Sequence, residues 1–570
     1  MNRVRLMVLV VVAAVVGMVA FGLWSRPSVE GKEHGGFSAE RVVEDIEVIS
    51  REHHSVAHPV ERAAVREYLV ERLGELGADT VKLYEYRGLV GPEDKHVVYN
   101  FDATNILAEF APRGAEEDYT SLMLVAHYDS RYSQPMPRRD TVWSYGAADD
   151  GYGVGVILET VAQALKYRDE WQQGVKVLFT DAEEVGMMGM KAQWQDDREV
   201  FDNVGLMINL EARGPYGPAL LFETSPGNER LMELYASAAE YPCTYSLTTV
   251  VYSFMPNFTD FTIVKDEIPG FNFSTIADIN HYHTDKDNFA NVNPQSIQHY
   301  GSQIVPIVHK YLTDGAYADR DSLKAERSTV NFTLPLLGLF NFSTTSYWIV
   351  NIVVFVAFVL LFVFDLLRGC VQLHKALRAA LRALLAAVVA LLVGELIAWV
   401  ACCVCDAEFK PFGVVQGVAG DNIIMAVSVV VMIAVVAMRY LRGRRGVVHL
   451  TAGSIRANAG DSAALLHATN SLYGALGIMF ILSQILIATI GENLMFFIPL
   501  MVTTTAIILY RTTRLRLWYL VAIALILLHA LSFLYALAMA LTIGTLGAVL
   551  MLALLDTLVV IPLVELYTRK

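Results

Sequence analysis

The chain has 570 residues, a formal net charge of −14 and 54% of its residues in the hydrophobic set. The apolar residues are concentrated in the second half, so the composition predicts a soluble domain followed by a membrane domain. The acidic balance argues against nucleic acid as a partner, because phosphate binding depends on clusters of lysine and arginine. A lipid bilayer is the expected partner of the second half.

The chain begins with an apolar run from Leu6 to Trp24, which follows Arg3 and Arg5. This run is about long enough to cross a bilayer as a helix, which takes ~20 residues. It contains no clear small-x-small cleavage site. We therefore expect residues 1–25 to be an uncleaved transmembrane anchor, with a cleaved signal peptide as the alternative.

Residues 26–320 alternate between two hydrophobic patterns. Short continuous apolar runs predict buried strands, and apolar residues at helical spacing predict the helices between them. Pro294 marks a helix start, and Pro306 is a point where that helix can kink. Strands that alternate with helices predict an α/β fold with a mainly parallel sheet flanked by helices. The expected strands are 122–126, 175–179 and 205–210, and the expected helices are 60–76, 153–165 and 297–312.

Five polar clusters lie where such a fold places its chemistry. Three directly follow expected strands, and open α/β sheets bind ligands beyond the carboxyl ends of their strands. The other two precede helices. Each cluster alone has an ordinary explanation as a turn, a helix start or polar surface, but their joint placement predicts a metal site. Imidazole and carboxylate together suit Zn²⁺. The clusters are His127-Tyr-Asp129, Asp181-Ala-Glu183-Glu184, Glu211-Ala-Arg213, Gly146-Ala-Ala-Asp149-Asp150-Gly151 and His281-Tyr-His283-Thr-Asp285.

At these residues the sequence resembles the M28 family of zinc peptidases, which includes bacterial leucyl-type aminopeptidases and membrane-bound relatives in the endoplasmic reticulum and the fungal vacuole. The resembling stretch runs from about residue 104 to 312 and carries AHYDSR, GAADDG, DAEEVGMMG, NLEARG and YHTDKDN. The resemblance implies a zinc-dependent metallopeptidase, a hydrolase with two zinc ions per chain. In such sites the two ions lie about 3.5–4 Å apart.

The resemblance also implies the metal ligands. Asp149 is expected to bridge the two ions, His127 and Glu211 to complete one, and Glu184 and His283 to complete the other. Many members of the family have Asp where this chain has Glu211, but the membrane-bound relatives resemble it in using Glu.

Three further residues are expected to assist these ligands. Asp129 would orient His127, as metal-bound imidazoles commonly require. Glu183 resembles the general base, which takes a proton from water and passes it to the leaving amine. Tyr282 is expected to stabilise the oxyanion together with zinc. Asp150 and His281 are neighbours of ligands and are not expected to bind metal.

Residues 321–345 are expected to be a linker, and residues 346–570 a membrane domain of about seven helices. Thr542-Ile-Gly544-Thr is the only break in the last long apolar run, so a tight re-entry is expected there. Glu395 and Asp556 are acidic residues inside this domain and are functional candidates unless they lie near interfaces or pair between helices. The expected spans centre near Ala357, Val389, Val431, Phe480, Thr503, Leu527 and Ala553.

Basic residues predict the orientation of the chain. With eight spans in all, every basic cluster falls on one side, which should be the cytoplasm. Both termini are then cytoplasmic, and the catalytic domain lies on the other side. The clusters are Arg3 and Arg5; Arg368, Lys375, Arg378 and Arg382; Arg439, Arg442, Arg444 and Arg445; Arg511, Arg514 and Arg516; and Arg569 and Lys570.

These features predict a membrane-anchored aminopeptidase that hydrolyses N-terminal residues from peptide substrates. The expected location is a bacterial cell membrane with the catalytic domain outside. The alternative is an endoplasmic reticulum or vacuole membrane with a lumenal domain. Two alternatives for function stay open: a single-zinc enzyme similar to glutaminyl cyclases, and a transporter or receptor whose soluble domain binds peptides.

Overall fold

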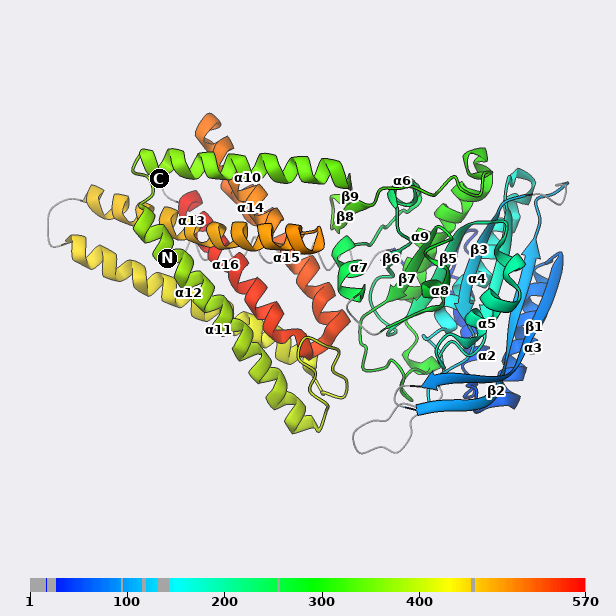
Figure 1. The fold of residues 1–570 in the computed structure, drawn as a ribbon. Coiled ribbons are helices and arrows are strands. Elements are labelled where there is room, and N and C mark those ends of the chain that lie inside the picture. Colours follow the sequence, from blue (N-terminus) through cyan, green and yellow to red (C-terminus); the bar gives the residue numbers. More distant parts are fainter. Residues whose placement is uncertain are drawn as a thin grey trace. The chain divides into compact units, whose positions relative to one another are not determined.

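The computed structural model describes residues 17, 27–93, 96–114, 119–131, 143–253, 257–452 and 457–568 (Figure 1). The chain forms two compact units. The first ends at Thr333 and takes in Leu337–Thr344, and the second contains Leu334–Leu336 and continues from Thr345. Apart from Gly17, the expected anchor at residues 1–25 lies outside the described residues.

The first unit is built around a seven-stranded sheet with the order β1-β2-β4-β3-β5-β7-β6. Strands β4, β3, β5 and β7 at its centre run parallel, and the strands at both edges run antiparallel to their neighbours. The predicted α/β fold is confirmed, with antiparallel strands added at the edges. The strands are β1 (Thr80–Glu93), β2 (His96–Phe110), β3 (Ser121–His127), β4 (Gly174–Thr180), β5 (Val204–Ala212), β6 (Leu220–Thr224) and β7 (Gly270–Thr275).

Helices cover both faces of this sheet, because each central strand buries alternate side chains on opposite faces. In β3, Leu122 and Leu124 pack in the core on one face, and Met123 and Val125 pack in the core on the other. Helices α2 (Ala39–Ile49), α3 (Pro59–Glu75), α4 (Gly151–Ala164), α6 (Glu229–Ala238) and α9 (Pro294–Thr313) contribute to the first core. Helices α5 (Met188–Asp196) and α8 (Asp260–Val264) contribute to the second.

Two helices next to the polar clusters begin with side-chain caps. Asp150 precedes α4, and its carboxylate accepts a hydrogen bond from the Gly153 N–H at 2.9 Å. Asn293 precedes α9, and its side chain accepts hydrogen bonds from the backbone N–H groups of Gln295 and Ser296. Pro294 lies in the first turn of this helix. Such caps satisfy backbone donors that a helix start leaves without partners. The helix α9 continues through Pro306.

Residues 321–345 contain a β-hairpin of β8 (Thr329–Leu334) and β9 (Gly338–Ser343). Stacked aromatic rings line it, with the Phe332 and Phe340 centroids 5.1 Å apart. The segment that the sequence predicts to be a linker therefore includes ordered secondary structure, and β9 leads directly into the first helix of the second unit.

The second unit consists of long apolar helices. Among the described residues, six helical segments are long and apolar enough to cross a membrane, by length and composition. The last of them, Leu517–Thr568, has 52 residues and contains two helices joined by the short 3₁₀ turn η5 (Thr542–Thr545). This turn lies at the expected break. The helices are α10 (Thr344–Leu367), α11 (Leu373–Cys405), α12 (Asp421–Ala452), α13 (Ala457–Ile490), α14 (Leu494–Thr513), α15 (Leu517–Leu541) and α16 (Leu546–Thr568).

Helix α16 packs against α11, α12, α13 and α15. Small residues allow its close approach to α11, since a Cβ added at Gly394 would lie 2.5 Å from the Gly547 Cα. Interfaces between membrane helices are commonly built from such small residues. Large apolar side chains on the outer helices remain exposed, for example Leu360 at 64% and Leu385 at 57%. These faces suit contact with lipid.

Candidate metal centre

The polar clusters converge at the carboxyl ends of the parallel strands. His127 is the last residue of β3, and Glu211 lies near the end of β5. The turn with Glu184 follows β4, and Asp149 lies just before α4. His283 comes from the segment between β7 and α9. The sequence predicts that three of these clusters follow strands and that two precede helices, and the structure brings all five residues together.

A first group consists of His127, Asp149 and Glu211. The His127 Nε2 atom lies 3.3 Å from Asp149 Oδ1 and 3.8 Å from Glu211 Oε2. All three side chains are buried. Their ligand atoms lie within 4.8 Å of one another, which is close enough for one ion to contact all three.

A second group consists of His283, Asp149 and Glu184. The His283 Nε2 atom lies 3.2 Å from Asp149 Oδ2 and 3.1 Å from Glu184 Oε2. The two carboxylate oxygens of Asp149 therefore face two different imidazoles. His283 has a φ of 57°. This left-handed conformation is uncommon for a residue with a side chain, and such residues cluster at functional sites.

The charges of the centre call for cations. Burial and the neighbouring acids raise the pKa values of Glu183, Glu184 and Glu211, because several carboxylates share one buried space. Burial alone would lower the pKa of His127, but hydrogen bonds to Asp129 and Asp149 raise it well above its usual value. The Glu184 Oε1 atom is buried and has no hydrogen-bond partner among the described residues. These nitrogen and oxygen donors fit the ligand preferences of zinc.

Asp129 contacts two parts of the centre. The His127 Nδ1 atom lies 2.9 Å from the backbone carbonyl oxygen of Asp129 and 3.6 Å from its Oδ1 atom. The Asp129 carboxylate accepts hydrogen bonds from the backbone N–H groups of Glu183 at 2.9 Å and Glu184 at 3.4 Å. Asp129 therefore lies where it can orient His127, as expected, and it also holds the turn that carries Glu183 and Glu184.

Two neighbours of the expected ligands have other partners. The Asp150 carboxylate caps α4. The His281 Nδ1 atom lies 3.1 Å from the Asp278 carboxylate, and that hydrogen bond raises the pKa of His281. Asp181, from the cluster after β4, is 3.1 Å from the Arg62 guanidinium and accepts from the Thr104 N–H at 2.8 Å.

Sequence reasoning missed two residues that support the ligands. Asp287 accepts hydrogen bonds from the N–H groups of Ala148 at 2.7 Å and Asp149 at 3.3 Å, which fixes the loop that carries the Asp149 carboxylate. Burial and the charge of Asp149 raise the pKa of Asp287 to about 7. The Arg131 guanidinium lies 3.2 Å from Glu184 Oε2. Both residues lie inside quoted motifs, YHTDKDN and AHYDSR, so a signal for them was present.

Two tyrosines lie near the centre. The Tyr282 ring stacks on the His283 ring with 3.6 Å between centroids, and the Arg213 guanidinium lies 5.6 Å from the same Tyr282 ring. The Tyr252 hydroxyl is buried and has no hydrogen-bond partner within the described parts of the chain. Burial raises the pKa of Tyr252, and the charges of Glu223, Glu211 and Glu183 raise it further. Nothing in the sequence near Tyr252 pointed to this position.

A parallel sheet with two carboxylate–imidazole groups at its carboxyl end is typical of zinc-dependent hydrolases. Residues 105–308 match the family model described as Peptidase family M28. The chain thus contains an M28 peptidase domain, and the resemblance seen in its motifs is confirmed.

Curated relatives match a part of the chain. Endoplasmic reticulum metallopeptidase 1 of Mus musculus is 29% identical over 224 residues, which are 39% of this chain and 24% of the mouse protein. The vacuolar membrane protease of Yarrowia lipolytica is 26% identical over 206 residues, which are 35% of this chain and 19% of that protein. The match thus spans about a quarter or less of each relative. The names of these relatives agree with the alternative location in an endoplasmic reticulum or vacuole membrane, and give no support to the bacterial one.

Two solved structures are similar in fold. A Zn-dependent exopeptidase from Parabacteroides distasonis has 20% identity and a TM-score of 0.38, covering 48% of this chain and 98% of that protein. A glutaminyl cyclase from Porphyromonas gingivalis has 18% identity and a TM-score of 0.37, covering 48% of this chain and 99% of that protein.

Proposed function

We propose that this chain is a membrane-anchored di-zinc aminopeptidase. The observation that carries the proposal is the position of Asp149, whose two carboxylate oxygens face His127 and His283 at 3.3 and 3.2 Å. A carboxylate shared in this way can bridge two ions. A centre for a single ion would leave one imidazole–carboxylate group without a metal.

His127 and Glu211 would hold one zinc ion, His283 and Glu184 would hold the other, and Asp149 would bind both. When bound, the ions would lower the pKa of a water molecule between them and polarise the scissile carbonyl. Two divalent cations also offset the crowded carboxylates, whose pKa values are raised while they are buried without a counter-charge.

Glu183 would act as the general base. Its backbone N–H is fixed by the Asp129 carboxylate at 2.9 Å, one residue before the ligand Glu184. This position allows the Glu183 carboxylate to accept a proton from water and to donate it to the leaving amine. The sequence assigned the oxyanion to Tyr282. We propose the Tyr252 hydroxyl as the donor instead, because it is buried without a hydrogen-bond partner among the described residues, whereas the Tyr282 ring stacks on His283.

Exopeptidase action is expected from the way a substrate's N-terminus would bind. A free α-amine would bind beside one zinc ion and a neighbouring carboxylate. An acetylated N-terminus has no free amine to bind there. The substrate class is therefore expected to be peptides with a free N-terminus.

The experiment uses the full-length chain, purified in detergent and supplied with zinc. Zinc is counted by elemental analysis, and a panel of aminoacyl reporters is compared with the same reporters carrying an N-acetyl group. We expect about two zinc ions per chain and hydrolysis of the free-amine reporters alone. A peptide with N-terminal glutamine is tested in parallel for pyroglutamate.

The alternatives give different results in this assay. One zinc ion together with ring closure of the glutamine peptide would support the cyclase alternative. Peptide binding without hydrolysis would support the transporter or receptor alternative. If the chain hydrolyses peptides, and Glu183→Gln loses this hydrolysis while it keeps its zinc, neither the cyclase nor the transporter or receptor alternative is needed.

We further propose that the catalytic unit lies on the non-cytoplasmic side. Arg368 follows α10, Arg439 lies in α12 and Arg511 lies in the last turn of α14. With helices that alternate in direction, these basic residues fall on one side, as the charge rule requires. Protease protection in sealed vesicles with a tag after Lys570 tests the eight-span topology. The tag should be protected when the cytoplasmic side faces inward, and its cleavage would mean an odd number of spans.

A further inference from the structure

Two ionisable side chains lie at the middle of adjacent membrane helices. His529 is twelve residues from each end of α15, and Asp556 is ten residues after the first residue of α16 and twelve before the last. At about 1.5 Å per residue, each lies roughly 15–18 Å from its helix ends. Since the hydrocarbon core of a bilayer is ~30 Å thick, both residues are near its midplane. They do not lie near an interface.

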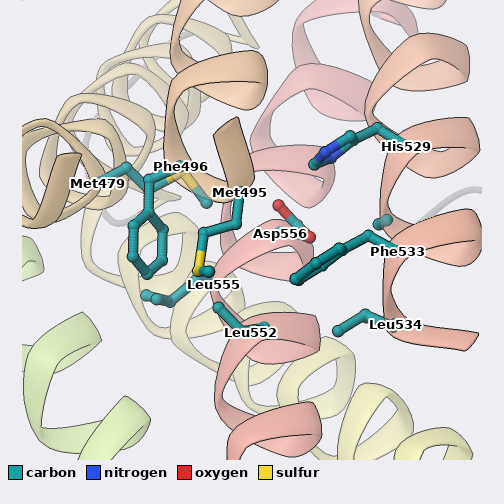
Figure 2. Close-up of a pocket in the computed structure, with 10 residues that line it drawn as sticks. Met479, Met495, Phe496, His529, Phe533, Leu534, Leu552, Leu555 and Asp556 are labelled. Atoms are coloured by element: carbon teal, nitrogen blue, oxygen red, sulfur yellow. The ribbon is translucent and has the colours of Figure 1, made fainter. Parts of the chain in front are cut away.

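The two side chains point into the same cavity. Figure 2 shows the Asp556 carboxylate and the rings of His529 and Phe533 directed into one space between helices. The other lining residues are apolar, or thioethers from α13 and α14: Met479, Met495, Phe496, Ala530, Leu534, Leu552 and Leu555. The free space is about that of a single water molecule. A peptide or other organic solute does not fit.

The Asp556 carboxylate is buried in this cavity and lacks a hydrogen-bond partner for one of its oxygens among the described residues. Its exposed fraction is 9%, and its Oδ1 atom is buried without a hydrogen-bond partner in the described part of the chain. An ionised carboxylate in that position is strongly disfavoured. It must either take up a cation or be neutralised by a proton.

The side chains that line the cavity show whether a metal cation or a proton neutralises Asp556. Calcium and magnesium require six or more oxygen ligands, and zinc requires three or four nitrogen, sulfur or oxygen ligands. The cavity offers one carboxylate and one imidazole, and its two thioethers are poor ligands for these ions. A proton needs no such shell.

No other titratable group of the helices packed on α16 lines this cavity, within the residues that the structure describes. Glu395 of α11 lies beside Gly547, nine residues before Asp556. Tyr440 of α12 donates to the Glu565 carboxylate at 2.7 Å, nine residues after Asp556. Helix α13 contributes Met479 to the lining. The facing group is therefore His529 of α15.

We infer that Asp556 and His529 form a proton-binding site in the centre of the membrane unit. One proton enters from water and converts the Asp556 carboxylate to a carboxylic acid. It passes to a ring nitrogen of His529, directly or through one water molecule, to give a carboxylate–imidazolium pair. No other bond forms or breaks. The site is separate from the zinc centre and does not depend on the proposed peptidase function.

Infrared spectroscopy on the full-length chain in liposomes tests this inference. We expect a carbonyl stretching band of a protonated carboxylic acid that changes with pH and shifts in D₂O. Asp556→Asn should remove this band. His529→Gln should move its pH midpoint by about one unit, a tenfold change in proton affinity. Glu395→Gln is the matched control, because it removes a half-buried acid of α11 that lies beside Gly547, outside this cavity, and it should leave the band in place.

Thermal unfolding of each variant shows that the membrane unit is still folded. If Asp556→Asn does not fold, Asp556→Glu keeps a carboxyl group and should shift the band without removing it. A band that persists unchanged in Asp556→Asn or in Asp556→Glu would overturn the assignment to Asp556. A midpoint that His529→Gln leaves unmoved would overturn the pairing.

Discussion

In the first unit, the buried acids Asp149, Glu184 and Glu211 crowd around two imidazoles. In the second unit, buried acids are spread out, and Asp365 and Glu565 pair with side chains of other helices. Asp365 pairs with Arg511 and accepts from the Tyr473 hydroxyl at 2.5 Å, and Glu565 accepts from Tyr440. A paired acid is satisfied by the protein itself, whereas crowded acids need cations from outside. The comparison separates acids that serve chemistry from acids that hold helices together.

The largest effect is expected from removing the shared carboxylate. Asp149→Ala takes away a ligand from both metal groups at once, so the affinity for both zinc ions should fall together. Peptide hydrolysis should fall to background, and elemental analysis should find less than one zinc ion per chain.

His283→Ala is the control, because it belongs to one group only and should weaken mainly one ion. His281→Ala should change neither zinc content nor activity. If His281→Ala loses zinc and His283→Ala does not, the wrong histidine has been assigned.

The next effect concerns Glu183, which lies beside the ligands but is not expected to bind metal. Glu183→Gln keeps the shape and removes the base, so kcat should fall by about 10²–10⁴-fold. Zinc content should stay near two per chain. Full activity in this variant would contradict the mechanism, and loss of zinc would mean that Glu183 is a ligand.

A smaller effect is expected from the tyrosines. Tyr252→Phe should lower kcat by roughly 10²–10³-fold, the usual consequence of losing one oxyanion donor. KM should change little, because the hydroxyl acts in the transition state. Tyr282→Phe keeps the ring that stacks on His283 and should have a weaker effect. If Tyr282→Phe lowers kcat more than Tyr252→Phe, the original assignment of the oxyanion to Tyr282 is the better one.

The difference between the two tyrosines shows what the sequence can reveal. Tyr282 was proposed because it adjoins His283 in a motif, and the five proposed metal ligands were assigned from motifs in the same way. Tyr252 lies on the short helix α7 (Ser246–Ser253), far from every motif, and only the fold brings it near Glu211. Asp287 likewise accepts a hydrogen bond from the N–H of Ala148, which lies 139 residues earlier in the sequence.

The same limit applies to the fold. Strands β3, β4 and β5 were predicted because they are continuous apolar runs. Strand β7 was not, since its buried centre contains Asn272 and Ser274. Asn272 is satisfied by Asn209 and Glu223, each at 3.0 Å. Polar partners on the two neighbouring strands of the sheet, β5 and β6, allow β7 to be buried without an apolar sequence. These partners are far from β7 along the chain, so a single sequence does not show them.

The smallest effect on hydrolysis is expected in the second unit. Asp365→Asn neutralises the partner of Arg511 while the Asp365 position stays buried. Since Asp365 belongs to the acids that only join helices, kcat/KM should remain within about twofold, a change near 0.4 kcal/mol in the barrier. The variant should instead lose about 1–3 kcal/mol of stability, the usual consequence of leaving a buried polar group without its partner. Thermal unfolding in detergent measures that loss.

Glu408→Gln is the matched control, because the Glu408 side chain is 68% exposed and its substitution should change neither kcat/KM nor stability. A fall in hydrolysis that equals the fall for Glu183→Gln would mean that the two units are coupled in catalysis, and that pairing alone does not mark an acid as structural.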